Sequence, residues 1–391
     1  MKTIKYGIIG VGNMGFTHLK NFMKGEVPHS TVVAVADINP AKLKHVKEVY
    51  PNEKIEYYDS GEKLIDAGNV DAVLIATPHY FHPPLTIRAL DKNISVVCEK
   101  PAGVYTKQVK EMNLAADRSK ALFTIMFNQR TNCLYRKMRE IMQSGGIGEI
   151  KRVNWIITNW YRSQRYYDSG DWRATWQGEG GGVLFNQCPH QLDLLQWVVG
   201  MMPVRVHAHC HFGKWHNIEV EDDVTAYFEY ANGATGVFVT STADSPGTNR
   251  FEINGSLGRL ICEDDKLIYC KNSVDERKHC FETDNAYAPI PFETIEPKTD
   301  GQNLQHVGIL RNFTNALLGL EPLFVKGQEG LFSVELMNAF LLSQWLGRTV
   351  ELPVDDELYL AELNKRRATS ITKSGSDVVV DLSGTYNGAK N

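Results

Sequence analysis

The stretch IKYGIIGVGNMGFTHLKNFMKGEVPHSTVVAVAD, residues 4–37, decides the fold expected for this chain. After its first apolar run come three glycines in the spacing G-x-G-x-x-G: Gly10, Gly12 and Gly15. The first permits a tight turn, the second lets the backbone approach a pyrophosphate, and the third lets helix pack on strand. The N–H groups at the start of that helix, around Asn13 and Met14, can bind phosphates. The stretch predicts a dinucleotide-binding fold.

Asp37 closes the second apolar run of this unit. A carboxylate at the end of that strand can accept hydrogen bonds from the adenosine ribose hydroxyls, and it repels a 2′-phosphate. The next residues, Ile38 and Asn39, supply no positive charge for such a phosphate. The expected cofactor is therefore NAD rather than NADP.

Length and composition set the broad class. At 391 residues the chain exceeds one typical domain, and a charged fraction of 23% is that of an ordinary soluble protein. A net charge of −4 gives no basic surface for nucleic acid, and no apolar run has the length of a membrane helix. Seven cysteines without C-x-x-C argue against a disulfide framework. The first strand starts close to Met1, so no signal peptide is expected and we predict a cytoplasmic protein.

Strand-like and helix-like segments alternate over residues 1–123, which predicts a Rossmann domain with a doubly wound parallel sheet. One buried strand, residues 70–76, ends at Thr77, Pro78 and His79, with His82 close behind. Ligands of open α/β sheets bind at the carboxyl ends of such strands. We therefore expect these four residues to contact the cofactor.

The pattern becomes extended in the second part of the chain. Alternating apolar residues and turn signals over residues 124–367 predict an α+β domain with a large, mostly antiparallel open sheet. We expect this domain to bind substrate and to mediate oligomers. A helix, residues 189–199, interrupts the sheet, and further helices are expected near residues 304–318 and 330–346. The tail, residues 368–391, is either a mobile terminus or contributes an oligomer-contacting strand through its apolar patch at Val378 to Leu382.

Glu99, Lys100 and Pro101 stand at the carboxyl end of another predicted strand, residues 95–98. A lysine there lies at the edge of the cofactor crevice, where its ammonium can polarise a substrate oxygen or relay a proton. Taken alone, such a lysine is more often a solvated charge. The combination of this motif with a second one, at residues 180–193, favours a functional lysine.

The run GGGVLFNQCPHQLD, residues 180–193, holds the second candidate group. Its glycines allow close approach to another backbone or a ligand, and Pro189 suits the first turn of a helix. His190 can act as a general base near neutral pH and shares a helix face with Asp193. Asn186 can hydrogen-bond a sugar hydroxyl. A histidine that is merely packed is the plainer alternative.

The segment just before this run, residues 159–176, is rich in aromatic and arginine residues. Aromatic faces stack on the C–H surfaces of sugars while arginines bind hydroxyls, so the segment suits the wall of a carbohydrate pocket. A packed loop or an interface is the alternative. The candidates are Tyr161, Arg162, Arg165, Tyr166, Trp172 and Arg173.

These motifs together resemble the Gfo/Idh/MocA oxidoreductases over roughly residues 4–365. The resemblance implies hydride transfer between NAD(P) and a sugar or polyol carbon, a Rossmann domain followed by a domain whose open sheet mediates dimers and tetramers, and catalytic roles for Lys100 and His190. This chain departs from the family motif D-x-G-x-H-x-x-D, with Asn186 for the first Asp and Cys188-Pro189 where Gly is usual. It also has His79 where Asn is common. Further cofactor contacts are expected at Glu99, Lys100 and Asn128.

Three functions follow from these features. The leading one is an NAD-dependent dehydrogenase of a sugar or glycoside ring hydroxyl, C3 included. The second is a redox-assisted glycosidase that retains NAD, and the third is a non-catalytic sensor of NAD or sugar. We expect a small-molecule carbohydrate substrate, no nucleic acid or membrane partner, and a homo-oligomer formed through the open sheet. A metal site at His207, His209 and His211 and a thiolate at Cys188 are considered and set aside.

Overall fold

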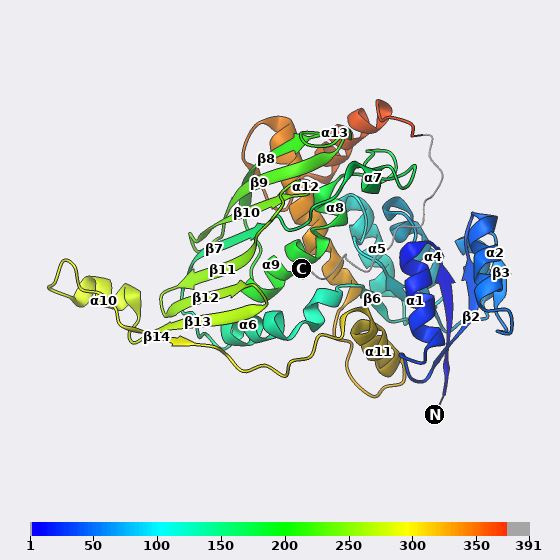
Figure 1. Cartoon of the computed structure of the whole chain (residues 1–391), viewed down its shortest axis with the longest axis horizontal. Helices are drawn as coiled ribbons and strands as arrows, with labels where there is room; N and C mark the ends of the chain where they lie inside the picture. The colour runs from blue at the N-terminus through cyan, green and yellow to red at the C-terminus, as the bar shows by residue number, and fades with distance from the viewer. Residues whose placement is uncertain (1, 374–391) are drawn as a thin grey trace.

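The computed structural model describes residues 2–373, which form two sheets with helices packed on them (Figure 1). The first sheet has six parallel strands in the order β3-β2-β1-β4-β5-β6. Its strands are β1 (Ile4–Ile9), β2 (Ser30–Ala36), β3 (Glu56–Tyr58), β4 (Ala72–Ile75), β5 (Ser95–Cys98) and β6 (Phe123–Ile125). This order, with the chain turning back beside β1, is that of a doubly wound dinucleotide fold.

Helices cover this sheet because its strands are apolar on both sides: every residue of β4 and β5 is buried. The helices are α1 (Asn13–Met23), α2 (Pro40–Val49), α3 (Gly61–Ala67), η1 (His79–Phe81), α4 (His82–Asp91) and α5 (Thr106–Arg118). Side-chain caps begin two of them: Asn39 accepts from the N–H of Ala41, and Ser60 from that of Lys63.

The second sheet has nine strands in the order β14-β13-β12-β11-β7-β10-β9-β8-β15. Its strands are β7 (Ile150–Ile157), β8 (Arg205–Phe212), β9 (Glu221–Glu229), β10 (Thr235–Ser241), β11 (Asn249–Gly255), β12 (Gly258–Glu263), β13 (Lys266–Asn272), β14 (Phe292–Ile295) and β15 (Val350–Glu351). All neighbours pair antiparallel except β7 and β10, which are parallel. The predicted fold class is confirmed.

Helices pack on one face of this second sheet, as Figure 1 shows. Those in contact with its strands include α6 (Cys133–Gln143), α8 (Val183–Asn186) and α12 (Gly330–Leu346). The same part of the chain also forms η2 (Asn128–Thr131), α7 (Gln164–Tyr167), α9 (Pro189–Val199), α11 (Gln305–Leu317), η3 (Gly327–Glu329) and α13 (Asp356–Ala368). Most of α12 is buried, and it contacts both β8 and α9. The opposite face carries the side chains of alternate residues such as His209 and Tyr227, which are exposed. An oligomer through that face remains a prediction.

The two parts of the chain are joined by buried polar contacts. The Tyr6 hydroxyl of β1 lies 2.8 Å from Thr314 Oγ1 of α11. The side chain of Asn338 on α12 accepts from the N–H of Thr106 and donates to the carbonyl of Val104. The six-stranded sheet ends at Ile125, two residues beyond the predicted limit of the first domain. The division at residue 123 and the tail boundary remain predictions.

The short helices α7 and α8 and the longer α10 (Glu276–Glu282) were not anticipated. Helix α10 lies on a segment that projects beyond the sheet edge at β14 (Figure 1), and none of its residues is buried. Without a buried face it lacks the apolar periodicity by which sequence predicts helices.

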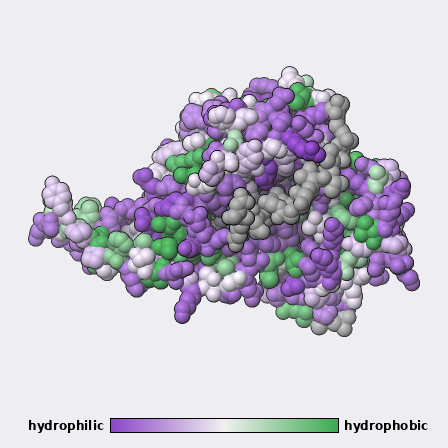
Figure 2. All heavy atoms as spheres, in the orientation of Figure 1, coloured by the Kyte–Doolittle hydropathy of each residue, from purple (hydrophilic) through white to green (hydrophobic). Residues whose placement is uncertain are grey.

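The face drawn in Figure 2 is mostly hydrophilic, with apolar residues scattered among polar ones. No helix within residues 2–373 has the length and apolarity to cross a membrane. The patch at Val378 to Leu382 lies outside the described residues.

Candidate functional site

The turn between β1 and α1 has the shape of a phosphate cradle. Gly10 has φ +85°, a left-handed conformation that favours glycine. A Cβ on Gly15 would lie 1.8 Å from the carbonyl oxygen of Gly10, so helix and strand approach here as only glycine allows. At Gly12 the nearest atom to an added Cβ is Lys42 Nζ, at 3.8 Å. Among the described residues, no atom outside the turn other than Lys42 Nζ lies within 4 Å of that Cβ position, so the backbone at Gly12 is open to the close approach of a pyrophosphate.

Asp37 lies beside this cradle, after the last residue of β2. Its Oδ2 accepts from the N–H of Val11 and its Oδ1 from that of Asn39, both at 2.9 Å. These bonds fix the carboxylate next to the glycine turn, where a ribose diol would sit. The predicted positions of the turn and the acid therefore fit a bound NAD.

The loop after β4 is tied to the loop after β5 by His82. Its ring nitrogens lie 2.7 Å from the carbonyl oxygens of Pro101 and Thr77. The Thr77 hydroxyl oxygen is buried and has no hydrogen-bond partner among the described residues. A buried polar atom in that state is typical of a ligand contact at a strand end. Pro78 lies between these contacts and η1.

His79, the first residue of η1, faces the second part of the chain. Its Nδ1 lies 3.1 Å from the carbonyl oxygen of Glu179, and its ring meets that of Trp172 edge-on at 5.6 Å. Burial, together with the nearby charges of His82 and Lys100, holds the pKa of His79 well below its ordinary value. A neutral imidazole at this position can hydrogen-bond without adding charge to the crevice.

Glu99 is buried and positions the lysine that follows it. Its Oε1 lies 2.6 Å from Nε2 of His18 on α1, and its Oε2 accepts from the N–H of Lys100 at 3.2 Å. Burial alone would raise its pKa, but the hydrogen bond and charge of His18 lower the pKa of Glu99 to about 2. Asn128, on η2 beyond β6, is buried and donates to Gln305. Neither His18 nor Gln305 was singled out from the sequence.

Lys100 crosses from the first part of the chain to the second. Its Nζ donates to the backbone carbonyl oxygen of Asn186, at 2.8 Å. Burial is the main cause that lowers its pKa, and the guanidinium groups of Arg173 and Arg162 act in the same direction. A lysine with a lowered pKa exchanges protons more readily near neutral pH.

His190 lies in the first turn of α9 and is 3% exposed. Its ring stands edge-on to Phe127, with centroids 6.4 Å apart. Burial and the charges of Lys100 and His306 hold the pKa of His190 well below its ordinary value. These effects favour the neutral imidazole, the form in which one ring nitrogen keeps the lone pair that a proton can join.

Asn186 joins a polar network that includes a residue missed from the sequence. Its Oδ1 accepts from the Tyr166 hydroxyl at 2.8 Å, and its Nδ2 donates to Glu179. The Tyr166 hydroxyl also accepts from Arg173 at 2.9 Å and from Gln187 at 3.1 Å. Glu179 is the acid in the run GEGGG, one residue before the glycines at residues 180–182. That position was the only available signal.

The structure adds an ion pair to the role expected for Asp193. Both its oxygens accept from Arg130, at 2.8 Å from Nε and 2.6 Å from Nη2, and Arg130 also binds Glu329. Asp193 and Arg130 are both fully buried. A carboxylate paired in this way orients helix α9, and its shared helix face with His190 did not indicate Arg130 as a partner. A contact of Asp193 with substrate remains a prediction.

The aromatic segment is only partly assembled around the network. Arg173 lies over the rings of Tyr166 and Trp172, at 4.6 and 4.8 Å, and Arg162 lies over Tyr166 at 5.2 Å. Tyr161 is 56% exposed and Arg165 is exposed as well, so their expected role is supported by the sequence alone.

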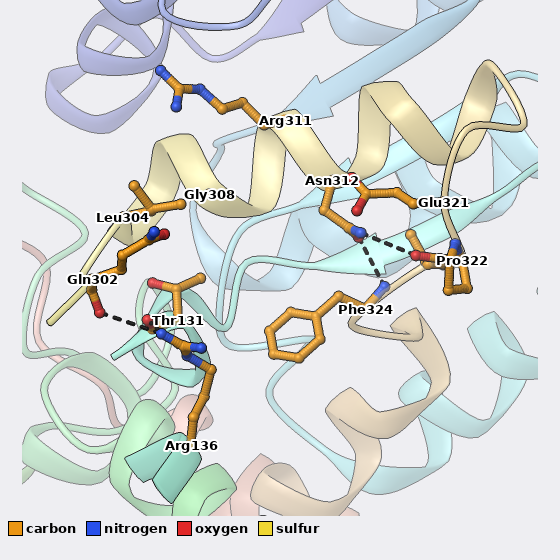
Figure 3. A pocket seen from close by; sticks show the side chains of 11 residues that line it. Thr131, Arg136, Gln302, Leu304, Gly308, Arg311, Asn312, Glu321, Pro322 and Phe324 are labelled. Carbon is orange, nitrogen blue, oxygen red and sulfur yellow. Dashed lines mark hydrogen bonds between the residues drawn. The ribbon is translucent and has the colours of Figure 1, made fainter. Parts of the chain in front are cut away.

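Two candidates that the sequence set aside are also located. Cys188 is buried against Thr240, and burial raises the pKa of its thiol to about 12, so no thiolate forms. Within residues 2–373 no group of three or more His, Cys, Asp or Glu side chains is placed to hold a metal ion. A hollow of about 570 Å³ lies between α6, α11 and the loop after α11 (Figure 3), and neither Lys100 nor His190 is among the residues that line it. Its Arg136 is paired with Asp300.

Comparison with known proteins agrees with this geometry. The NAD-binding Rossmann-fold model of the oxidoreductase family matches residues 4–127, and the model of the GFO/IDH/MocA C-terminal domain matches residues 135–261. The chain is 26% identical to rhizopine catabolism protein MocA of Rhizobium meliloti over 52% of this chain, and the match spans only 59% of that protein. It is 24% identical to D-glucoside 3-dehydrogenase of Escherichia coli over 82% of this chain and 90% of that protein.

Among solved structures, the WlbA dehydrogenase from Chromobacterium violaceum, in complex with NADH and UDP-GlcNAcA, is similar with a TM-score of 0.77. It is 27% identical, and the match covers 91% of this chain and 97% of that one. The two matching models together cover more than half of the chain, and their boundary falls where the six-stranded sheet ends. The chain belongs to the Gfo/Idh/MocA family of NAD-binding oxidoreductases.

Proposed function

We propose that this oxidoreductase transfers hydride between NAD and the carbon of a ring hydroxyl in a sugar or glycoside, with C3 as the favoured position. The observation that carries the proposal is that the buried His190 of α9 lies within electrostatic range of Lys100, which follows β5 and donates to the Asn186 carbonyl four residues before His190. The first can accept a proton and the second can stabilise charge on oxygen. Together they meet the needs of alcohol oxidation.

Bound NAD supplies a hydride acceptor at C4 of its nicotinamide. We assign contacts with the cofactor to the residues expected from the sequence: Gly10, Gly12, Asn13, Met14, Gly15, Asp37, Thr77, Pro78, His79, His82, Glu99, Lys100 and Asn128. The Lys100 ammonium polarises the substrate hydroxyl oxygen, and His190 takes the hydroxyl proton as the C–H electron pair departs and the carbonyl forms. Positioning of the two groups and proton transfer are the contributions of the chain itself.

A carbohydrate substrate is supported by the wall formed by Tyr166, Trp172 and Arg173, which offers aromatic faces beside hydrogen-bond donors. Similarity to a D-glucoside 3-dehydrogenase over 90% of that protein supports a glycoside and the C3 position. Similarity to a dehydrogenase solved with a sugar nucleotide supports the same substrate class. We assign Asn186 to substrate orientation and retain Tyr161, Arg162 and Arg165 as candidates for the outer wall.

The test is NADH formation by the purified protein with NAD and a panel of sugars, inositols and glycosides. We expect one class to yield stoichiometric NADH, and we expect His190→Ala and Lys100→Ala each to lower kcat by about 100-fold or more. NAD affinity, measured by calorimetry, should remain intact in His190→Ala. Release of an aglycone without NADH would favour the redox-assisted glycosidase. Tight NAD binding without turnover of any substrate would favour the sensor.

A further inference from the structure

Glu179 is a buried acid at the centre of the substrate half of the site, and the proposed reaction leaves it without a role. It is 2% exposed and lies in the loop before the glycine run. Its Oε1 accepts from Asn186 Nδ2, and its Oε2 accepts from the N–H of Ala174 at 2.6 Å. A buried carboxylate so close to the reaction centre invites a functional explanation.

The hydrogen-bond pattern selects the ionised form of Glu179. Each of its oxygens faces an N–H donor that has no lone pair to offer, and only a carboxylate presents acceptors on both sides. A glutamine would turn its NH2 group against either the Ala174 N–H or the Asn186 NH2. Burial is the largest effect and raises the pKa of Glu179, and Arg173, the two N–H donors and Lys100 offset part of that rise.

The ionised carboxylate fixes the orientation of the Asn186 side chain. Because Nδ2 donates to Glu179, Oδ1 must face the Tyr166 hydroxyl, from which it accepts at 2.8 Å. The backbone carbonyl of Asn186 meanwhile accepts from Lys100 Nζ at 2.8 Å. Glu179 therefore sets the polarity of a chain of hydrogen bonds that surrounds the reacting lysine.

Glu179 also contributes to the balance of charge at Lys100. Two acids, Glu99 and Glu179, favour its ammonium form, and two guanidinium groups, those of Arg173 and Arg162, oppose it. The imidazoles of His79 and His190 and the thiol of Cys188 also lie within electrostatic range of Lys100. Glu99 is already engaged by His18, so Glu179 is the acid on the substrate side.

We propose that Glu179 is a positioning residue for the reaction: as a buried anion it orients Asn186 and keeps Lys100 in its ammonium form. The inference rests on the proposed function, because it assumes that Lys100 acts on the substrate oxygen. It adds the acid that supports that lysine from the substrate side. Glu179 touches neither substrate nor cofactor in this assignment.

The test compares Glu179→Gln and Glu179→Asp with the wild-type enzyme in the pH dependence of kcat and of kcat/KM. Loss of a neighbouring anion destabilises the ammonium, so the alkaline limb should move to lower pH by about 1 unit in Glu179→Gln. The kcat of that variant should fall by up to about 100-fold because Asn186 loses its orientation. Glu179→Asp keeps the charge and should keep the alkaline limb near its wild-type position. NAD affinity should be unchanged in both variants.

Glu335→Gln is the matched control, since Glu335 is also buried and accepts from a backbone N–H, that of Val354, but lies on α12. It should lower stability without moving the pH profile. The inference would be overturned if Glu179→Gln kept the wild-type pH profile. It would also be overturned if Glu179→Asp or Glu335→Gln moved the alkaline limb as far as Glu179→Gln does. Absence of dehydrogenase activity in the wild-type protein would instead overturn the proposed function, so the two failures are distinct.

Discussion

The two halves of the site are built by different means. In the cofactor half, the cradle consists of backbone: a glycine turn with φ +85° at Gly10, a helix–strand contact that excludes a Cβ at Gly15, and open space at Gly12. In the substrate half, the site consists of buried side chains, in which Asn186 connects Lys100, Glu179 and Tyr166 by hydrogen bonds. The cofactor half therefore depends on positions that have no side chain, and the substrate half depends on side chains that hydrogen-bond to one another.

This difference has consequences for how each half fails. A backbone cradle is disturbed by any added atom, but the disturbance stays local and affects mainly the group it binds. A buried polar network is disturbed by loss of a single partner, because the others are then left without hydrogen bonds or with uncompensated charge. Variants in the cofactor half should therefore change NAD affinity, and variants in the substrate half should change turnover or stability.

The largest effect is expected on stability, in the buried ion pair Asp193–Arg130 of the substrate half. Asp193→Asn leaves a fully buried guanidinium with Glu329 as its remaining carboxylate partner among the described residues, which should lower the free energy of unfolding by about 3–5 kcal/mol. Denaturant unfolding of the protein measures it. Asp300→Asn, which breaks the exposed pair with Arg136, is the control and should leave the free energy of unfolding nearly unchanged, because solvent screens that pair. Equal losses in the two variants would contradict a structural role for Asp193.

The cofactor half offers a second, smaller test in two glycines. Gly15→Ala forces the new Cβ against the Gly10 carbonyl, so stability should fall by about 1–3 kcal/mol and NAD affinity by about 10-fold to 100-fold. Gly12→Ala meets only open space in the protein and should keep its stability while losing NAD affinity. Calorimetric titration and thermal unfolding separate the two effects. A Gly12→Ala variant with unchanged affinity would show that no pyrophosphate approaches there.

The cofactor half could be predicted from the sequence more fully than the substrate half, and the reason is physical. The glycine turn and Asp37 belong to one local strand–helix–strand unit, whose spacing in the chain fixes their spacing in space. The helices over residues 189–199 and 330–346 were likewise predicted at the bounds observed. The first begins at Pro189 and ends before Gly200, and the second is a long apolar segment that ends before Gly347. Local order in the sequence was sufficient in these cases.

The parts of the substrate half that the sequence did not predict depend on contacts between residues far apart in the chain. Arg130 and Asp193 are separated by 63 positions, and Lys100 and Asn186 by 86, so neither contact leaves a local pattern. Asp193 was consequently assigned to substrate on helical spacing alone, which could not reveal a partner on η2. Glu179 was overlooked for a related reason: next to a glycine run, an acid carries no periodicity that distinguishes a buried anion from a solvated one.

Substitution of Asp37 tests whether a side chain of the cofactor half selects NAD over NADP. Asp37→Ala removes the acceptor fixed by the N–H groups of Val11 and Asn39, so NAD affinity should fall by about 10-fold. NADP affinity should change less, because the repulsion of its 2′-phosphate is lost as well. Competition titrations with the two nucleotides give the ratio. Asp59→Asn, an exposed acid of the same part of the chain paired with Lys63, serves as control and should leave the ratio unchanged.

The smallest effect is expected at Tyr166, where the substrate half meets its aromatic wall. Tyr166→Phe keeps the ring under Arg173 but removes the hydroxyl that donates to Asn186 and accepts from Arg173 and Gln187. Because Asn186 remains held by Glu179, kcat should change by less than about 3-fold, while KM for the substrate should rise by about 3-fold to 10-fold. Tyr167→Phe removes the neighbouring hydroxyl, which donates to Thr242, and should leave KM unchanged. A fall in kcat at constant KM would instead place the Tyr166 hydroxyl in the chemical step. The aromatic wall would then take part in the reaction, and its role could no longer be separated, as substrate binding alone, from that of the hydrogen-bond network around Asn186.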